Sequence, residues 1–468
     1  MSWSREEIVL ATGGQILREG RETVFGEVVT DSAKAVKGSV FVALKGERFD
    51  GHDFLREAVR RGAACLVVHK RPAFSRLEDA TAIQVPDTLK ALGNLAHHRR
   101  KAMGPKVLAI TGSNGKTTTK EMVAAILERA ALQGNPLRGR ILKTEGNFNN
   151  LVGLPQTLLR LRGQEKVVVL ELGTNRPGEI RRLTEIADPD LGLVTSVAPA
   201  HLAGLDSLAG VAREKGELFR MMNPRGIAVV NLDDPWVRRL GEKFKGEKIT
   251  YGKGGKVRGE ARKSLGIRGT EFTLRVGSER RRIRLRLSGE HNFSNAVGAA
   301  AMAYGLGADL EAVRRGLETV KPLPMRMALE KWKGIGIIND AYNANPASME
   351  AALKTLAEIG GKREKIAILG DMLELGRESE RSHLELGRQT ARYRIDRLYL
   401  LGEQAHRVKR GALLAGMEEE RVVVGKNHRE IARMVRRQVK KGAWLLFKGS
   451  RGMKMERVLE ALKETGED

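Results

Sequence analysis

VLAITGSNGKTTTK, residues 107–120, is the stretch around which the chain is organised. Mostly aliphatic residues at 107–110 precede a turn rich in Gly, Ser and Asn, and an apolar-periodic run begins at Met122. This order predicts a strand, a tight loop and then a helix. A loop that ends at a helix N-terminus directs unpaired backbone N–H groups and the positive end of the helix dipole at one point. Such a point favours phosphate binding.

The loop also contains the side chains that a nucleotide site needs. Lys116 stands where a cation would meet the outer phosphates, and Thr117 supplies a hydroxyl suited to Mg²⁺. The usual phosphate-loop motif has a glycine where this chain has Ile110, so the turn is built on Gly112 and Gly115. An ordinary glycine-rich turn is the alternative. Because strand, loop, Lys-Thr pair and helix occur in order, we interpret the stretch as a nucleoside triphosphate site.

Length and composition describe a multidomain globular protein. A chain of 468 residues exceeds one typical core, and about three domains are expected. No apolar run approaches the roughly 18 residues of a membrane span, and residues 1–10 lack the pattern of a signal peptide. We therefore expect a cytoplasmic protein. Its single cysteine, Cys65, is expected to be a buried small hydrophobic residue.

The net charge of +26 raises the question of a polyanionic partner. Nucleic acid and small polyanionic substrates are both compatible with such an excess. Aromatic residues make up only 4% of the chain, which provides little material for base stacking. In residues 278–287, SERRRIRLRL, arginine alternates with Ile or Leu from Arg282 to Leu287, and this favours a strand with one solvated basic face. No nucleic acid partner is expected.

Changes in pattern divide the chain into three α/β domains. Residues 1–104 form the expected N-terminal domain, which ends at a Gly-Pro break. Residues 105–320 form the central domain, where alternating strands and helices predict a mostly parallel sheet and late β-rich runs predict hairpins at its edge. After a proline-marked link at 321–325, residues 321–468 alternate again and predict a Rossmann-like domain. The expected strands are 39–44, 64–68, 166–170, 190–197, 227–231, 335–339, 365–369, 397–401 and 443–447, and the expected helices include 52–61, 291–304, 346–358 and 453–464.

Polar residues follow two of the expected strands directly. Glu171 closes the run VVVLE, and an acid at the C-terminal end of a parallel strand beside a phosphate loop is where Mg²⁺ needs a carboxylate. A helix cap is the alternative role. Asp340, Tyr342, Asn343 and Asn345 follow a strand of the third domain, at the edge where ligands bind in open α/β sheets. This loop is richer in side-chain amides than an ordinary connection, which favours ligand binding.

Other polar residues, considered alone, leave their roles open. Asn292 and Asn295 stand at the head of a small, apolar helix, where they either cap the helix or together contact a purine. His201 fits a loop histidine whose hydrogen bonds are satisfied. Lys215 falls in a helical pattern, where a lysine is usually a solvated charge. The polar loop that begins at Lys45 could hold an anionic ligand, although ordinary loops share its composition.

The motifs together resemble those of the ATP-dependent Mur ligases. Spread over residues 111–457, they are TGSNGKTTTKEM, EGNFNNLVGLPQTLL, LELGTNRPGEI, AHLAGLDSLAGVAREKGELF, GEHNFSNA, NDAYNANPASM, LGDMLELG and KGSRGMKMERV. The N-terminal TDSAKAVKGSVFVALKGERFDGHDF is similar to the UDP-substrate domain of that family, although Ala33 stands where the family motif has arginine. The chain contains both AYNANP and GNFNN, and in this it resembles the branch of the family that adds D-Ala-D-Ala.

This resemblance implies an ATP-dependent amide ligase of cytoplasmic peptidoglycan synthesis. The terminal carboxylate of UDP-N-acetylmuramoyl-tripeptide would attack the γ-phosphate of ATP, giving an acyl phosphate and ADP. The amine of D-Ala-D-Ala would then displace phosphate and form the amide. The implied cofactors are ATP, bound between the central and third domains, and two Mg²⁺ ions.

The resemblance also implies the role of individual residues. Lys116, His201 and Lys215 would be catalytic, with Lys215 present as the carbamate that it forms with CO₂. The metal ligands would be Thr117, Glu171, His201 and Lys215. The nucleotide-binding residues would be Thr111, Gly112, Ser113, Asn114, Gly115, Lys116, Thr117, Thr118, Asn292, Asn295, Arg326, Asp340 and Asn343. The residues that bind the UDP-linked substrate would be Asp31, Ser32, Lys45, Asn147, Asn149 and Asn150.

Two alternatives stay open at this point. A related ligase of the same architecture, similar to the diaminopimelate-adding or folylpolyglutamate-forming enzymes, would add a single amino acid. A nucleic-acid-binding ATPase would account for the net charge of +26 in another way. A screen of amine substrates separates these alternatives from D-Ala-D-Ala ligation. We expect the protein to be a monomer.

Overall fold

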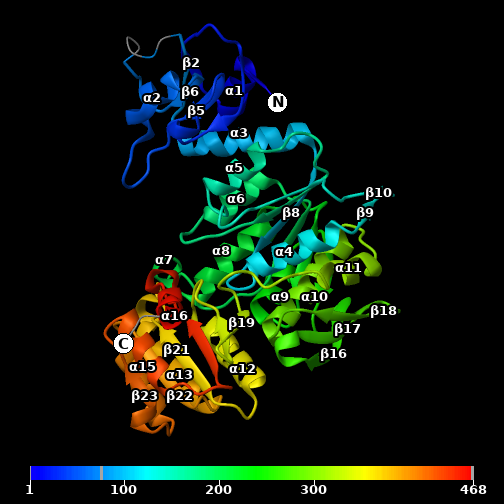
Figure 1. Cartoon of the computed structure of the whole chain (residues 1–468). Coiled ribbons are helices and arrows are strands. Elements are labelled where there is room, and N and C mark those ends of the chain that lie inside the picture. Colours follow the sequence, from blue (N-terminus) through cyan, green and yellow to red (C-terminus); the bar gives the residue numbers. More distant parts are fainter. Residues whose placement is uncertain (1, 74–76, 78, 465–468) are drawn as a thin grey trace.

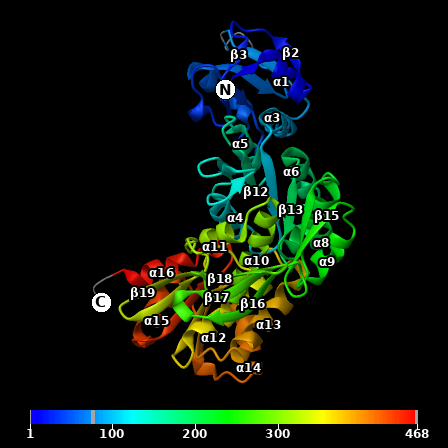
Figure 2. The same ribbon diagram turned by 90° about the vertical axis from the view of Figure 1, so that its right-hand side faces the viewer.

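The computed structural model describes residues 2–73, 77 and 79–464. Three α/β domains follow one another along the molecule, with the N-terminal domain at one end, the central domain in the middle and the third domain at the other end (Figures 1 and 2). Within the described residues, every helix is too short or too polar to cross a lipid bilayer. The predicted three-domain α/β architecture is confirmed.

The N-terminal domain contains β1 (Trp3–Ser4), α1 (Arg5–Thr12), β2 (Gln15–Arg18), β3 (Val24–Phe25), β4 (Val28–Val29), β5 (Ser39–Val42), α2 (Leu55–Arg60), β6 (Ala63–Val68), β7 (Thr81–Gln84) and α3 (Thr88–Met103). Its five-stranded sheet has the order β2-β7-β6-β5-β4, in which only β2 runs antiparallel to its neighbour. Cys65 lies on β6 and is fully buried, as predicted. The long helix α3, capped at its start by Asp87, leads into the central domain.

The central domain contains β8 (Lys106–Thr111), α4 (Lys116–Leu127), β9 (Ala131–Leu132), β10 (Asn135–Pro136), β11 (Ile141–Lys143), α5 (Gly153–Leu159), β12 (Val167–Glu171), α6 (Glu179–Ala187), β13 (Leu191–Val194), α7 (Leu202–Leu205), α8 (Leu208–Met221), β14 (Ile227–Asn231), α9 (Pro235–Glu242), β15 (Glu247–Tyr251), β16 (Val257–Ser264), β17 (Thr270–Val276), β18 (Glu279–Leu285), α10 (Glu290–Gly305) and α11 (Leu310–Leu317). One nine-stranded sheet has the order β11-β12-β8-β13-β14-β15-β16-β17-β18. The strands from β11 to β15 are parallel, and β16 to β18 form antiparallel hairpins at the edge. Both predictions for this sheet are therefore confirmed.

The predicted strand, loop and helix at 107–120 lie inside this sheet. β8 is flanked by β12 and β13, and helices cover both faces of the sheet, so the side chains at 107–110 are all fully buried. Burial on two faces explains why β8 is a continuous aliphatic run and not an alternating one. The helices α4, α10 and α11 pack on one face, and α5, α6, α8 and α9 pack on the other.

The third domain contains β19 (Ala328–Trp332), β20 (Ile335–Asn339), α12 (Pro346–Gly360), β21 (Lys365–Gly370), α13 (Ser379–Arg392), β22 (Arg397–Leu401), α14 (Ala405–Leu414), β23 (Val422–Val424), α15 (His428–Gln438), β24 (Trp444–Lys448) and α16 (Glu456–Lys463). Its six-stranded sheet has the order β19-β20-β24-β21-β22-β23 and is parallel except for the edge strand β19. The helices α12, α13 and α14 pack on one face, and α15 and α16 pack on the other. The sheet's carboxyl edge meets the central domain.

Some predicted boundaries were wrong by a few residues. The expected helix at 52–61 starts as a 3₁₀ turn, Gly51–Phe54, because Asp50 accepts the His52 N–H at 2.9 Å. The expected strand at 190–197 ends at Val194 because the next residues bond to the phosphate loop: the Ser113 N–H donates to the Ser196 carbonyl at 2.8 Å. The last helix begins at Glu456, after a 3₁₀ turn.

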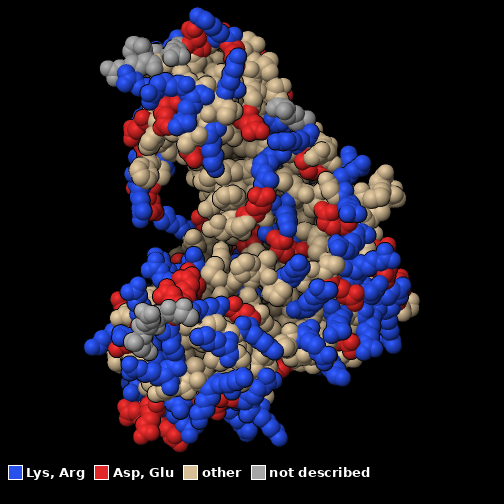
Figure 3. Space-filling model, viewed as in Figure 1, with Lys and Arg blue, Asp and Glu red and all other residues tan. Residues whose placement is uncertain are grey.

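The basic surface is dispersed, as the sequence indicates. On the face shown in Figure 3, Lys and Arg side chains are interspersed with Asp and Glu over all three domains. On β18, Arg282 and Arg284 are exposed, whereas Ile283 and Leu285 are fully buried, so the predicted solvated basic face is confirmed. Arg282 pairs with Glu271 of the neighbouring strand at 2.6 Å. Cross-strand ion pairs of this kind offset part of the charge locally.

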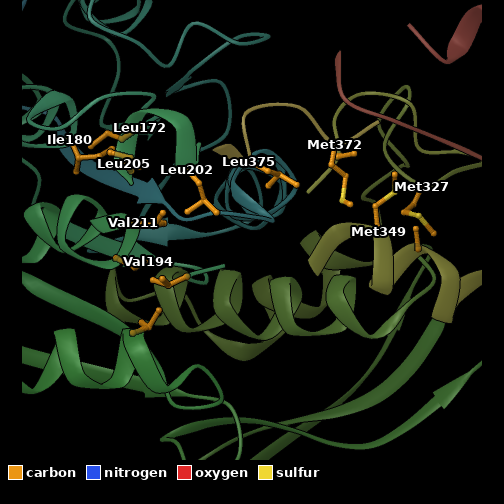
Figure 4. Close-up of a cluster of buried hydrophobic side chains, with 14 of the residues drawn as sticks. Leu172, Ile180, Val194, Leu202, Leu205, Val211, Met327, Met349, Met372 and Leu375 are labelled. Carbon is orange, nitrogen blue, oxygen red and sulfur yellow. The ribbon is translucent and has the colours of Figure 1, made fainter. Parts of the chain in front are cut away.

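A shared hydrophobic cluster joins the central and third domains. Figure 4 shows side chains of the central domain, among them Leu202 and Leu205, in one cluster with Met327, Met349, Met372 and Leu375 of the third domain. Polar contacts accompany it: Arg262 donates two hydrogen bonds to Glu358, at 2.9 and 3.0 Å. The two domains therefore pack against each other through buried surface.

Candidate active site

A cavity of about 750 Å³ lies between the central and third domains. Its central-domain wall comes from the phosphate loop and from the carboxyl ends of β12 and β13. Its opposite wall comes from the loops after β20, β21 and β24. Ligands bind at the carboxyl edge of open α/β sheets, and here two such edges face each other. The lining includes these predicted site residues: Ser113, Asn114, Gly115, Lys116, Thr117, Thr118, Asn147, Asn149, Asn150, Glu171, His201, Asn292, Asn295, Arg326, Asp340 and Asn343.

The phosphate loop is shaped by two glycines that no other residue could replace without strain. Gly112 has φ +145°, and a Cβ atom there would lie 1.9 Å from Oγ1 of Thr195. Gly115 has φ +84°, and its Cβ would lie 2.3 Å from Oδ1 of Asn295. Gly115 is also the N-cap of α4, and no side chain caps this helix. The first N–H groups of α4 are thus left to bind an anion in the cavity.

Lys116 is folded back onto its own loop. Its Nζ donates to the Gly112 carbonyl at 2.7 Å. Burial lowers the pKa of Lys116, the nearby Glu171 carboxylate opposes that effect, and Arg326 adds to it. The side chain lines the cavity, so a phosphate bound at the loop would be within the reach of a cation.

Glu171 and Thr117 provide oxygen atoms at the floor of the cavity. Glu171 closes β12 and is only 3% exposed. Its Oε1 accepts a hydrogen bond from Asn149 at 2.8 Å, whereas its Oε2 has no hydrogen-bond partner among the described residues. A buried carboxylate oxygen without a partner is costly unless a cation or water satisfies it. A carboxylate and a hydroxyl beside a phosphate site are the hard oxygen ligands that Mg²⁺ takes, so the residues fit this ion.

Metal ligation by protein side chains alone is not indicated. Among the described residues, no group of three or more His, Cys, Asp and Glu side chains is arranged to hold a metal ion. Mg²⁺ usually keeps several waters and binds through one or two carboxylates together with substrate phosphates. Any Mg²⁺ in this cavity would therefore depend on the nucleotide for part of its coordination.

His201 contacts the third domain. It is the N-cap of α7 in a left-handed conformation, with φ +55°. Its Nδ1 lies 2.7 Å from Oε2 of Glu374, and this hydrogen bond holds the pKa of Glu374 below its ordinary value. Both residues line the cavity. His201 therefore has a hydrogen-bond partner, as a loop histidine with satisfied hydrogen bonds would, but this partner comes from another domain.

Lys215 is buried, contrary to the expectation of a solvated charge. It lies on α8 with 1% of its surface exposed, on the side of the helix that packs into the domain with Val211 and Leu218. Burial is the main reason that its pKa is well below the ordinary value, repulsion by Lys116 lowers it further, and Glu214 opposes the shift. The amine therefore loses its proton more readily than an exposed lysine does. Lys215 is not one of the residues that line the cavity.

Asn292 and Asn295 lie in the first two turns of α10 but do not cap it. The N-cap is Gly289, so the alternative role as caps was wrong. The Nδ2 of Asn292 donates to the Ser288 carbonyl at 2.8 Å, and the side chain of Asn295 packs against Gly115 of the phosphate loop. Both face the cavity together, as the spacing of three residues predicted.

The third domain contributes a cluster of fixed polar groups. The guanidinium of Arg326 lies over the Tyr342 ring, 3.8 Å from its centroid. Oδ1 of Asp340 accepts the Met327 N–H at 3.0 Å, and its Oδ2 pairs with Lys448. These hydrogen bonds hold Asp340 at the cavity wall. Arg326 and Asp340 thereby present one cation and one carboxylate toward the phosphate loop.

The loop 147–150 lies beside Glu171 at the other end of the cavity. Asn149 reaches Glu171, as described, while Oδ1 of Asn150 accepts the N–H groups of Val152 and Gly153 at 3.1 and 2.8 Å. This end of the cavity therefore lies next to the start of α5. Asp31, Ser32 and Lys45 of that domain do not line this cavity.

Two of these N-terminal residues have local partners. Asp31 accepts the Ala33 N–H at 3.0 Å, and Ser32 donates to Glu57 at 3.0 Å. The loop that begins at Lys45 ends at Asp50, where the buried His52 ring accepts the His69 N–H on Nε2 and donates from Nδ1 to Asp50 at 2.7 Å. The structure does not bring these residues into contact with the predicted nucleotide site.

Sequence reasoning missed several residues that line the cavity. Among them are Asn175, His291, Glu374, Lys448 and Arg451. Nδ1 of His291 is buried and has no hydrogen-bond partner among the described residues. Asn345 exchanges two side-chain hydrogen bonds with Asn114 of the phosphate loop, at 2.8 and 3.3 Å. The motifs GEHNFSNA, LGDMLELG and KGSRG contained a signal, since each places polar residues just beyond a strand or at the head of a helix.

Fold and site together define a three-domain α/β protein in which a phosphate loop faces a third domain across a polar cavity. Family models match along its length: "Mur ligase family, catalytic domain" at residues 25–100, "Mur ligase middle domain" at 110–303 and "Mur ligase, glutamate ligase domain" at 325–451. The chain belongs to the Mur ligase family.

Relatives within the family are similar over nearly the whole chain. The UDP-N-acetylmuramoyl-tripeptide–D-alanyl-D-alanine ligase of Escherichia coli K12 is 37% identical over 453 residues, which cover 96% of each chain. A crystal structure of MurF from Acinetobacter baumannii superposes with a TM-score of 0.91 at 32% identity, over 99% of each chain. MurF ligase from Thermotoga maritima, solved in complex with ADP, gives a TM-score of 0.81 at 29% identity, over 93% of this chain and 97% of that one.

Proposed function

We propose that this protein is an ATP-dependent ligase that joins D-Ala-D-Ala to UDP-N-acetylmuramoyl-tripeptide in peptidoglycan synthesis. The observation that carries the proposal is the cavity in which the phosphate loop, Glu171 and the polar groups of the third domain converge. The relative from Escherichia coli, whose name states this activity, supports the choice of substrates. We place the reaction in the cytoplasm, where ATP and UDP-linked precursors are available.

The chemistry requires that a carboxylate be made reactive toward an amine. A peptide carboxylate oxygen attacks the γ-phosphorus of ATP, the bond to the β–γ bridging oxygen breaks, and an acyl phosphate and ADP result. The amine of D-Ala-D-Ala then attacks the acyl carbon and loses a proton, and inorganic phosphate leaves with the bonding electron pair. Water must be excluded, since it would hydrolyse the acyl phosphate. The cavity is walled by residues of two domains, an arrangement that favours such exclusion.

The central domain would bind and orient the phosphates. The N–H groups at the start of α4 would hold the β- and γ-phosphates, and Lys116 would leave the Gly112 carbonyl to offset the charge that develops during transfer. Thr117 and the unpartnered Oε2 of Glu171 would hold one Mg²⁺, with His201 as a ligand for a second. When bound, Mg²⁺ neutralises phosphate charge and fixes the phosphates in line with the attacking carboxylate.

Lys215 is proposed to act as a carbamate. Because burial keeps its pKa low, the neutral amine is available to attack CO₂, forming an N–C bond and releasing a proton. The carbamate would add oxygen atoms of the kind that Mg²⁺ prefers, which the amine lacks. The cation of the neighbouring Lys116 would offset the negative charge of the carbamate.

The remaining site residues are proposed to select the substrates. Asn292, Asn295, Arg326, Asp340 and Asn343 would hold adenine, ribose and phosphate, while Asn147, Asn149 and Asn150 would meet the growing peptide end. Asp31, Ser32 and Lys45 would contact the UDP end, which lies far enough from the peptide terminus for the N-terminal domain to bind it. The corresponding domain divisions are 1–104, 105–320 and 321–468, and we propose a monomer.

An amine screen tests the proposed function. Phosphate release from ATP is measured with UDP-N-acetylmuramoyl-tripeptide and either D-Ala-D-Ala or single amino acids as the amine. Release that requires D-Ala-D-Ala, with the pentapeptide product detected by mass, is the expected result. Release with single amino acids alone would assign the chain to another branch of the family. ATPase activity stimulated by nucleic acid and indifferent to the muramoyl peptide would refute ligation altogether.

A further inference from the structure

We infer that Glu374 of the third domain is a positioning residue for His201 of the central domain, so that the metal-binding face of the cavity is complete only when the two domains are docked. The inference rests on the proposed function in one respect, which is the role of His201 as a metal ligand. The inference adds Glu374, which lies 173 positions after His201 in the chain, to the residues of the proposed metal site.

The geometry fixes the proton on one ring nitrogen of His201. Nδ1 lies 2.7 Å from Oε2 of Glu374. An ionised carboxylate only accepts hydrogen bonds, so Nδ1 carries the proton and donates it. Because Nδ1 is engaged by Glu374, Nε2 is the ring nitrogen left to act as a ligand. A histidine that ligates a metal commonly donates its other N–H to a carboxylate in this way, which fixes the ring and raises its basicity.

Both partners are held in unusual backbone conformations at the point of contact. His201 has φ +55° and Glu374 has φ +64°, and neither is a glycine. Left-handed residues of this kind persist where the surrounding structure determines them, and they cluster at functional sites. A second contact, from the Ala203 N–H to the Glu374 carbonyl at 3.0 Å, ties the two segments together through the backbone.

The loop that carries Glu374 is anchored on both sides. The Met372 N–H donates to Nε2 of the fully buried His383 at 3.0 Å, and the Leu373 N–H donates to Oγ of Ser450 at 2.8 Å. Met372 and Leu375 belong to the hydrophobic cluster between the domains (Figure 4). The direction of Glu374 toward His201 is thus determined by buried contacts, although its own side chain is 58% exposed.

The competing interpretation is an ordinary exposed ion pair between domains, which would contribute little. Arg262 and Glu358 supply the matched control, because they also pair across the same two domains and lie outside the cavity lining. If each pair only helps to dock the domains, removing either glutamate should change metal affinity equally. If Glu374 positions His201, only removal of Glu374 should weaken metal binding.

Mn²⁺ binding in the presence of ADP, measured by isothermal titration calorimetry, tests this inference without relying on turnover. We expect Glu374→Ala to weaken Mn²⁺ binding by about tenfold or more, and Glu374→Gln to weaken it less, since the amide oxygen can still accept the Nδ1 proton. Glu358→Ala is expected to bind Mn²⁺ as the wild type does. Circular dichroism checks that each variant is folded. If Glu374→Ala is unfolded, the Mn²⁺ affinity of Glu374→Gln is compared with that of the wild type instead.

Wild-type affinity for Mn²⁺ in both Glu374 variants, or an equal loss in Glu358→Ala, would overturn the inference. The amine screen on the wild type runs alongside. Failure of D-Ala-D-Ala ligation there refutes the proposed function, while the Mn²⁺ comparison still reports on Glu374. Ligation by the wild type together with unaltered Mn²⁺ binding in the Glu374 variants refutes only the positioning role.

Discussion

Lys116 and Lys215 are two lysines of the central domain that the structure places in low-dielectric surroundings. Each pKa is lowered mainly by burial, and Lys116 depresses the pKa of Lys215 further. Lys116 lines the cavity, whereas Lys215 is buried and is not one of the lining residues. In the proposed mechanism Lys116 would meet phosphate as a cation, and Lys215 would be the amine that is modified.

Replacing Lys116 by Ala should abolish turnover. In the proposed mechanism the side chain would offset charge in the transition state, and removing one such group from a preorganised site costs at least about a hundredfold in rate. Phosphate release under the conditions of the amine screen measures the loss. Lys106→Ala is the matched control, because Lys106 lies at the other end of β8 and pairs with Asp190 at 2.8 Å on the surface. Normal turnover in Lys116→Ala would contradict the assignment of the phosphate loop.

Replacing Lys215 by Ala should inactivate the enzyme, and short carboxylates such as formate should restore part of the activity. The added carboxylate can occupy the position of the missing carbamate oxygens. Phosphate release is measured as a function of formate concentration. Lys120→Ala is the control, since Lys120 is equally buried but donates to the Thr144 carbonyl and would not become a ligand. Full activity of Lys215→Ala without additive would exclude the carbamate.

At the scale of elements, two segments differ in what determines their conformation. They are the strand-loop-helix unit from β8 to α4 and the loop after β21. β8 and α4 are fixed by local patterns, namely an aliphatic run, glycines at the turn and an apolar-periodic helix. The loop after β21 is held by distant groups, His383 on α13 and Ser450 after β24. Its shape depends on residues that no local pattern connects.

His383 should make the stability of the third domain depend on pH. Burial lowers its pKa, and this outweighs the Ser379 carbonyl and the Asp371 carboxylate, which favour the charged ring. An unfolded histidine has a pKa of about 6.5, so the unfolded state binds a proton first as the pH falls. The stabilisation by His383 is therefore fully present above the unfolded pKa and is lost as the pH falls below it.

Thermal unfolding of the wild type and of His383→Gln, compared at pH 8 and pH 5, checks this expectation. The glutamine amide oxygen can still accept the Met372 N–H but does not titrate. The unfolding temperature of the variant should therefore fall less between pH 8 and pH 5 than that of the wild type. His406→Gln, at an exposed position of α14, should respond to pH as the wild type does. An identical pH response in His383→Gln would show that other groups dominate.

At the scale of the whole molecule, the nucleotide cavity exists because two sheets present their carboxyl edges to each other. The hydrophobic cluster in Figure 4 holds them in that relation. Reciprocal hydrogen bonds between Asn114 and Asn345 link the phosphate loop itself to the N-terminus of α12. The shape of the cavity is thus a property of the domain interface.

Placing a charge in the interface should open the molecule. Leu202→Asp introduces a carboxylate at a position that is 5% exposed, and burying it without a partner costs roughly several kcal/mol. We expect a larger radius of gyration by small-angle X-ray scattering and weaker ADP binding, with secondary structure retained. Leu10→Asp, at a position 77% exposed on α1, should change neither. An unchanged radius of gyration would mean that other contacts hold the domains together.

The sequence by itself determined the elements and much of the site. Periodicity predicted most helices and strands to within a few residues, because burial on one or two faces leaves a local pattern. The phosphate loop was predicted from its glycines, Lys116 and Thr117 for the same reason, since a loop before a helix N-terminus is a local structure. Asp340 and Asn343 were found because they follow a strand directly.

Only the tertiary structure decided which of these groups meet. The burial of Lys215 depends on the packing of α8, since its helical pattern alone predicts a solvated lysine. The pairing of His201 with Glu374 joins residues 173 positions apart, and no local pattern records a contact of that separation. The physical reason is that backbone conformation and amphipathicity are short-range properties, whereas burial, hydrogen-bond partners and pKa values depend on the surroundings that the whole fold assembles.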